Sequence, residues 1–281
     1  DVTGVFSGKK LIALEAGNTE NICYGIAFDI GTTTVVGMLW DMASVKLSGV
    51  TARTNPQSIY GADVISRIQY CNEGENHLAN MQRKIMDCCN DMIRELTESC
   101  QIGSDSIYDV TAVGNTTMSH LFLGVHPQSL ARTPFAPVFC HSVNMLAREL
   151  GLQVNRGANV CFLPNMAGHV GADISAVLLA TYLQIKEGAN IAIDIGTNGE
   201  ILLEKDGKLY ACSTAAGPAF EGAAITMGMR AADGAIEKVK IGKDSVEIKT
   251  IEDGKPIGIC GSGLIDAVAE LLKAGLVLPG G

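Results

Sequence analysis

Residues 28–34 read FDIGTTT and residues 193–200 read IDIGTNGE, so the chain contains the sequence Asp-Ile-Gly-Thr twice, beginning at Asp29 and at Asp194. Each copy follows an apolar run that is typical of a buried strand. A single Asp-Ile-Gly-Thr is ordinary turn chemistry. Two copies at the same point of a repeated pattern instead favour two related turns with a shared role.

The same pattern of strands surrounds both copies. Around the first, residues 22–30, 34–42 and 45–54 read as strands joined by tight turns. Around the second, strands are expected at 190–196, 199–205 and 209–214. A strand–turn–strand–turn–strand unit that occurs twice indicates an α/β protein with two similar subdomains.

The segments between and after the two units predict further elements. Residues 76–100 carry apolar side chains at spacings of three and four, which predicts an amphipathic helix. The remaining expectations are a linker or arriving strand at 1–21, strands at 107–114 and 159–164, helices at 115–124, 142–150 and 168–184, a hairpin at 235–251, and a helix after the Gly-rich turn at 261–263.

Composition excludes several classes of function. The net charge of −9 and the pI near 5.0 argue against a partner that is nucleic acid or an anionic membrane. No apolar run approaches the roughly 20 residues that span a bilayer, and the longest, AVLLATYL at 176–183, reads as a buried helix. No secretory signal is visible, and a start at Asp1 indicates a fragment or a processed chain. The expected location is the cytoplasm.

Nine cysteines occur with no C-x-x-C pair. This spacing argues against a disulfide framework, a structural zinc site and a plant-type iron–sulfur cluster within the chain. The cysteines are expected to be reduced thiols, mostly buried.

The two turns suggest phosphate binding. Exposed N–H groups around such a turn can hold phosphate oxygens, Gly31 and Gly196 allow a close approach, and threonines add hydroxyl donors. An aspartate there would repel a phosphate unless a cation lies between them. Asp29 and Asp194 are therefore candidate Mg²⁺ ligands and catalytic acids, with structural turn acids as the alternative.

Other residues have two interpretations each. Glu200 either orients a water or metal or is an exposed strand residue. Residues 115–117 (Asn-Thr-Thr) either face a ligand or cap a helix, and Asp173 either approaches the site or lies on a helix surface. The Gly261-Ser262-Gly263 turn either presents a flat surface to a nucleobase or is a plain connection, and it fits neither the dinucleotide nor the Walker motif. Cys260 is expected to serve packing.

Two Asp-x-Gly-Thr turns followed by a Gly-Ser-Gly helix start resemble the actin/hexokinase/chaperone ATPase superfamily. The resemblance implies two RNase-H-like subdomains, at 22–165 and 166–281, with ATP in the cleft between them and the second subdomain incomplete. It implies an inter-subdomain helix near 163–173. It also implies nucleotide contacts from Gly31, Thr32, Thr33, Thr34, Gly196, Thr197, Asn198, Gly199, Gly217, Glu221, Gly261, Ser262 and Gly263.

Longer motifs narrow the resemblance, which runs from about residue 22 to the end of the chain. NPQSIYGADVISRI (55–68), AVGNTTMSHLFLG (112–124), DIGTNGEI (194–201), the 213–236 segment and GICGSGLIDAV (258–268) are similar to the reductive activators of corrinoid proteins. That family implies an enzyme in which ATP turnover drives an electron from an N-terminal [2Fe–2S] domain to a corrinoid protein, reducing Co(II) to Co(I). The cluster domain is expected outside this chain.

Two other functions stay open at this point. One is a small-molecule kinase of the same superfamily, which needs an acceptor pocket with a base near the γ-phosphate. The other is a nucleotide-gated binding module without turnover, in which closure around ATP switches a partner surface. The corrinoid partner, its methyl donor and the oligomeric state, with a homodimer among the options, are not determined by the sequence.

Overall fold

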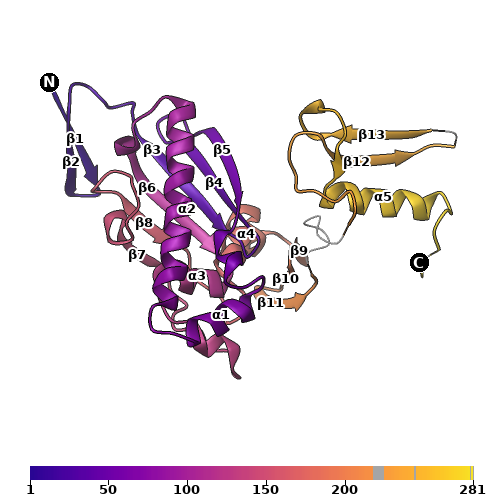
Figure 1. Cartoon of the computed structure of the whole chain (residues 1–281). Helices are drawn as coiled ribbons and strands as arrows, with labels where there is room; N and C mark the ends of the chain where they lie inside the picture. The colour runs from indigo at the N-terminus through magenta and orange to yellow at the C-terminus, as the bar shows by residue number, and fades with distance from the viewer. Residues whose placement is uncertain (218–224, 244, 279, 281) are drawn as a thin grey trace. The chain divides into compact units, whose positions relative to one another are not determined.

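The computed structural model describes residues 1–217, 225–243, 245–278 and 280 (Figure 1). The chain forms two compact units, and each is described by itself. The first comprises residues 1–190 with 204–209, and the second comprises residues 191–203 with 210–281. The subdomain limits expected from the sequence remain predictions.

A six-stranded mixed sheet forms the centre of the first unit. Its strand order is β5-β4-β3-β6-β8-β7, with bounds β3 (Tyr24–Ile30), β4 (Thr34–Asp41), β5 (Lys46–Thr54), β6 (Ile107–Gly114), β7 (Val143–Leu146) and β8 (Asn159–Phe162). Strands β3, β4 and β5 form an antiparallel meander, whereas β6 lies parallel to β3 and β8 lies parallel to β6. The turn of the first Asp-Ile-Gly-Thr therefore lies at the end of a central strand.

Helices complete this unit: α1 (Val64–Asn72), α2 (His77–Cys100), α3 (Thr116–Leu123) and α4 (Ala172–Thr181). Helix α2 confirms the prediction at 76–100, and it contacts β4 and β5. Its apolar positions from Met81 to Leu96 are buried in the core, because a repeat of three and four places them on one helical face.

Three segments differ from expectation. Residues 163–171, where the inter-subdomain helix was expected to begin, form no helix, and α4 begins only at Ala172. The predicted helix at 142–150 is wrong: β7 pairs with β8 from Val143 to Leu146, and a short 3-10 helix at Ala147–Glu149 follows. Sheet pairing has overridden the local helix preference of this segment. The linker or arriving strand expected at 1–21 is a hairpin of β1 (Val2–Ser7) and β2 (Lys10–Ala16), which turns at Gly8 with φ of 60°.

The second unit contains most of a three-stranded sheet, together with a hairpin and its helix. The sheet has the order β11-β10-β9, with β9 (Asn190–Ile195), β10 (Asn198–Lys205) and β11 (Lys208–Ala215). Strands β12 (Ala235–Ile241) and β13 (Val246–Thr250) form the predicted hairpin, β14 (Gly258–Ile259) lies parallel to β12, and α5 (Gly261–Lys273) packs on β12. The second strand–turn–strand–turn–strand unit is thus confirmed.

Short 3-10 helices join these elements at Pro56–Ile59, Ser104–Ser106, Gln128–Ala131, Leu183–Ile185 and Ile251–Asp253. In the described part of the chain, no helix has the length and apolar character that crossing a membrane requires.

All nine cysteines are free thiols in the structure. Four are buried, three are half-buried, and Cys140 and Cys212 are exposed, so fewer are buried than the sequence suggested. Burial raises the pKa of the Cys71 thiol to about 11, and the pKa of Cys89 is raised for the same reason. These two buried thiols stay protonated at neutral pH and serve packing.

Candidate functional site

The first Asp-Ile-Gly-Thr turn connects β3 to β4. Asp29 is exposed near the end of β3, between Val36 of β4 and Val113 of β6. Glycine is required at position 31, because a Cβ there would lie 2.5 Å from the carbonyl oxygen of Thr34. The turn is therefore as tight as the sequence predicted.

Three successive carbonyl groups of this turn are held from one side. The Asn55 Nδ2 group donates to the Gly31 oxygen at 2.7 Å, and the Asn55 backbone N–H donates to the Thr33 oxygen at 2.8 Å. Between them, Arg67 Nη2 donates to the Thr32 oxygen at 2.6 Å. The carbonyl oxygens of Gly31, Thr32 and Thr33 therefore all accept hydrogen bonds from Asn55 or Arg67.

Sequence reasoning assigned no role to Asn55 or Arg67. Both lie in the 55–68 motif, one of those on which the resemblance rests, and this was the feature of the sequence that could have pointed to them. Their contacts with the turn depend on α1 and on a 3-10 helix that Asn55 caps, and these bring residues distant in sequence to the back of the turn.

The end of β6 contributes a further contact. Asn115 caps α3 by accepting from the Met118 N–H at 3.0 Å, and its Nδ2 group donates to the Thr32 hydroxyl at 2.8 Å. The cap interpretation is therefore confirmed, and Asn115 also contacts the turn. Thr116 and Thr117 are buried, and the Thr116 hydroxyl donates to the Ala167 carbonyl at 2.7 Å.

Helix α4 begins beside this contact. A Cβ at Gly171, its N-cap residue, would lie 2.6 Å from the Gly114 carbonyl oxygen, so glycine allows the close approach. Asp173 lies in the first turn of the same helix. The structure thus brings Thr32, Asn115 and the N-terminal end of α4 together in one unit.

The second turn connects β9 to β10. The Gly196 N–H donates to the Asn198 oxygen at 3.0 Å, which closes the turn. The N–H groups of Ala216 and Gly217 donate to the Thr197 oxygen at 3.3 and 2.8 Å, so the structure brings Gly217 to this turn. Gly217 has a φ of +83°, a conformation that favours glycine. Glu221 lies outside the described residues.

Two carboxylates interact at the second turn. Burial raises the pKa of Asp194, and it also raises the pKa of Glu200, to which the negative charge of Asp194 contributes. The Ser213 hydroxyl donates to Glu200 Oε1 at 2.8 Å and opposes part of that increase. Because both acids are partly desolvated and repel each other, a divalent cation between them would stabilise their ionised forms.

No group of three or more His, Cys, Asp or Glu side chains suited to a metal occurs among the described residues. A Mg²⁺ site in a nucleotide-binding protein uses only one or two carboxylates, with water and phosphate oxygens as its other ligands, so it does not require a group of three such side chains.

The Gly-Ser-Gly sequence forms the first turn of α5. A Cβ at Gly263 would lie 2.1 Å from the Ile236 carbonyl oxygen, so this glycine allows α5 to pack on β12. Cys260 is buried, and its thiol lies 3.3 Å from the same oxygen. The expected packing role of Cys260 is consistent with this burial. Ser262 is exposed, and nucleotide contacts from Gly261 and Ser262 remain predictions.

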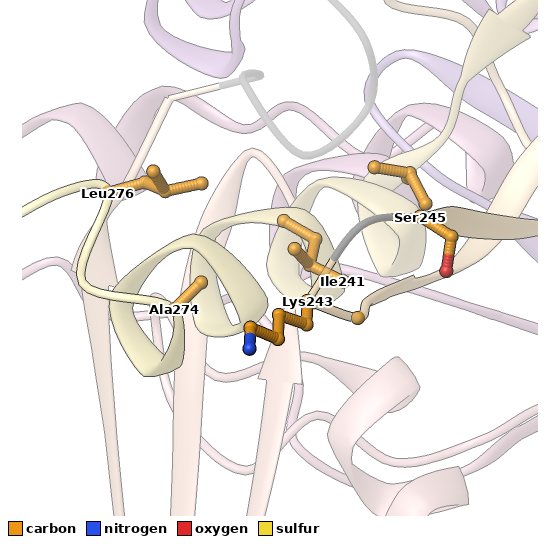
Figure 2. A pocket seen from close by; sticks show the side chains of 7 residues that line it. Ile241, Lys243, Ser245, Ala274 and Leu276 are labelled. Atoms are coloured by element: carbon orange, nitrogen blue, oxygen red, sulfur yellow. The ribbon is translucent and has the colours of Figure 1, made fainter.

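A pocket lies elsewhere in the second unit (Figure 2). It is formed where the β12–β13 turn meets the C-terminal end of α5, with Lys243 and Ser245 on one side and Ala274 and Leu276 on the other. None of its described lining residues is one of the site residues that the sequence predicted. The predicted nucleotide-binding residues that the structure describes therefore lie outside this pocket.

The mixed sheet and the two Asp-Ile-Gly-Thr turns define an ASKHA-type domain protein of the actin-like ATPase class. Residues 188–281 match the family model described as the C-terminal domain of RACo, the ASKHA domain. Residues 24–186 match the model of the RACo middle region. The chain belongs to the RACo family.

Comparisons with individual proteins agree with this assignment. The chain is 40% identical over 274 residues to the corrinoid activation enzyme RamQ of Eubacterium limosum, covering 97% of this chain and 46% of that protein. It is 26% identical over 285 residues to the Co(II) methylated amine-specific corrinoid protein reductase of Methanosarcina barkeri, covering 90% and 52% respectively. The chain spans about half the length of these curated relatives.

A solved structure is also similar along almost the whole chain. The reductive activator for corrinoid, iron-sulfur protein superposes with a TM-score of 0.88 at 38% identity, covering 95% of this chain and 43% of that one. The similarity supports the mixed α/β fold described above.

Proposed function

We propose that this chain is the ATP-binding, ATPase part of a reductive activator of a corrinoid protein. The full activator would couple ATP hydrolysis to the one-electron reduction of Co(II) to Co(I). Supporting this, the chain belongs to the RACo family, and its curated relatives are named a corrinoid activation enzyme and a corrinoid protein reductase. The observation that carries the proposal is the Asp194–Glu200 pair, placed at a tight turn within the ASKHA region.

The residues fit Mg·ATP. Burial raises the pKa of both acids, and the charge of Asp194 adds to the rise at Glu200, so a nearby divalent cation would stabilise the ionised carboxylates. Asp29 and Asp194 would hold Mg²⁺. The nucleotide would contact Gly31, Thr32, Thr33, Thr34, Gly196, Thr197, Asn198, Gly199, Gly217, Glu221, Gly261, Ser262 and Gly263. When bound, Mg·ATP supplies the phosphoanhydride bond whose hydrolysis drives the reaction.

The side chains of this chain have separate roles in that proposal. The first turn is held by Asn55, Arg67 and Asn115, so its donors are oriented before a ligand arrives. Glu200, oriented by Ser213 and with its pKa raised by burial, would orient the attacking water and accept its proton.

Electron transfer requires parts beyond these residues. We infer that a [2Fe–2S] domain of the full activator donates the electron and that a corrinoid protein in the cytoplasm accepts it. Each ~59 mV of uphill transfer for one electron costs about 1.4 kcal/mol, and this cost is the physical reason for coupling to ATP.

The test uses the full activator with its cluster reduced and with a corrinoid protein in the Co(II) state. Addition of Mg·ATP should convert the visible spectrum from Co(II) to Co(I), whereas ADP should not. A full activator with an intact cluster that leaves Co(II) unchanged would contradict the proposal. A phosphorylated small molecule in a substrate screen would instead support a kinase.

A further inference from the structure

Arg67 is a fully buried cation behind the first turn. Its relative exposure is 0%, and it extends from α1 between the 3-10 helix at Pro56–Ile59 and α3. Its Nε donates to the Gly61 oxygen at 2.9 Å and its Nη2 donates to the Thr32 oxygen at 2.6 Å. Its Nη1 lies 3.2 Å from the sulfur of Met118 and 3.4 Å from Gln57 Oε1.

All of these acceptors are neutral. Among the described residues, no carboxylate forms an ion pair with Arg67, and Asp63, whose charge acts on it, is an exposed N-cap residue. Desolvation lowers the pKa of Arg67 to about 10, so the guanidinium stays charged at neutral pH. A buried charge is costly unless an opposite charge compensates it.

The contact with Thr32 links this charge to the surface of the turn. The Thr32 carbonyl belongs to the peptide group whose N–H is on Thr33, and the two point in opposite directions. A cation on the carbonyl polarises the peptide group, which makes its N–H a stronger donor to an anion. Asn55 orients the two neighbouring carbonyls in the same way.

We propose that Arg67 is a positioning residue that holds the first turn in its phosphate-binding orientation and supplies, through the Thr32 peptide group, positive potential for the outer phosphates of a nucleoside triphosphate. It does so without contacting the ligand. This inference rests on the proposed function, since it assumes that the turn binds ATP.

The experiment compares ATP with AMP, which lacks the outer phosphates. Dissociation constants of both nucleotides are measured by calorimetry with Mg²⁺ for the wild-type protein, R67M, R67K and the control R83Q. Arg83 is exposed on α2 and bonds to Asn80, so R83Q removes the same charge from the same unit. We expect R67M to raise the Kd of ATP about ten-fold and that of AMP less than two-fold. R67K should lie between R67M and the wild type, and R83Q should leave both values unchanged.

Three outcomes overturn the inference. A folded R67M with the wild-type Kd for ATP shows that Arg67 has no influence on the ligand. An equal loss of ATP and AMP shows a general structural role. A wild-type protein that binds no ATP removes the proposed function together with the inference, whereas the first two outcomes leave the proposed function intact.

R67M replaces a buried charged side chain with an apolar one, and this change can stop the variant from folding. In that case the inference is tested with R67K instead, by measuring hydrogen–deuterium exchange of the amides of residues 28–34. Because lysine cannot reproduce the fork of the guanidinium, the amides of the turn should exchange faster in R67K, and ATP should restore protection. Exchange identical to the wild type would overturn the inference.

Discussion

Ser213 on β11 donates a hydrogen bond of 2.8 Å to Glu200 on β10 and so orients this buried carboxylate. Burial and the charge of Asp194 both raise the pKa of Glu200, and the hydrogen bond from Ser213 lowers it in part. The sequence separates these three residues, but adjacent strands bring them together at the second turn. The arrangement has consequences for pH, metal binding and stability.

The first prediction concerns the pH dependence of stability. Because the folded-state pKa of Glu200 is raised above its unfolded value of about 4.3, the folded protein keeps that proton to a higher pH than the unfolded chain does. This contribution of Glu200 to the free energy of unfolding is fully present below the unfolded-state pKa, and it is lost as the pH rises through the folded-state pKa. E200Q should therefore remove the part of this pH-dependent loss of stability that Glu200 causes.

Urea unfolding at pH 4 and pH 7 measures this difference without added Mg²⁺. The matched control is E247Q, because Glu247 is exposed on β13 of the same unit. The stability of E200Q relative to the wild type should increase between the two pH values, whereas that of E247Q should change much less. An E200Q protein with the pH dependence of the wild type would show that Glu200 is not the group responsible.

The second prediction concerns Asp194 and Mg²⁺. D194N removes a charge that favours the cation but repels phosphate, so it should weaken the binding of Mg·ATP by at least about ten-fold. Binding of ATP in EDTA should not weaken. Calorimetry with and without Mg²⁺ separates the two effects, and D206N, in the exposed turn after β10, is the control. Equal weakening in both conditions would argue against a metal ligand.

The third prediction concerns His120, which is fully buried in α3. Its Nδ1 lies 2.7 Å from the Thr116 oxygen and its Nε2 accepts from the Val138 N–H at 3.1 Å, so these contacts require the neutral ring with the proton on Nδ1. Burial lowers its pKa. The unfolded chain therefore takes up the proton first as the pH falls through about 6.5, and stability decreases there.

H120Q should reduce this acid sensitivity between pH 7 and pH 5. It should also lower the free energy of unfolding at pH 7 by about 1–3 kcal/mol, because the Val138 N–H loses its partner. Urea unfolding at both pH values provides the measurement, with H141Q at an exposed histidine as the control. If H120Q lost as much stability between pH 7 and pH 5 as the wild type does, His120 would not be the group responsible for the acid sensitivity.

The fourth prediction concerns the packing of α5. G263A places a methyl group against the Ile236 carbonyl and should destabilise the protein by about 1–3 kcal/mol. G103A is the control, since a Cβ at Gly103 would meet nothing within 4 Å. Thermal unfolding checks both variants. An unchanged Tm for G263A would contradict this packing role.

Local patterns predicted much of the fold because they report burial directly. The stripe from Met81 to Leu96 is buried on α2, and Asn115 caps α3 as its position before the helix indicated. The helix expected at 142–150 failed because the segment pairs with β8, and a pairing partner distant in sequence leaves no local signal.

The sequence by itself determined that the chain has two related turns, each with an aspartate, a glycine and hydroxyl donors, and its longer motifs indicated the family. Only the tertiary structure decided what supports those turns. Arg67 and Asn55 hold the first through contacts that depend on a capped helix packing behind it, and Ser213 and Glu200 meet at the second because β10 and β11 are neighbours. The physical reason is that desolvation and hydrogen bonding depend on the residues that surround a group in space, which its neighbours in sequence do not specify.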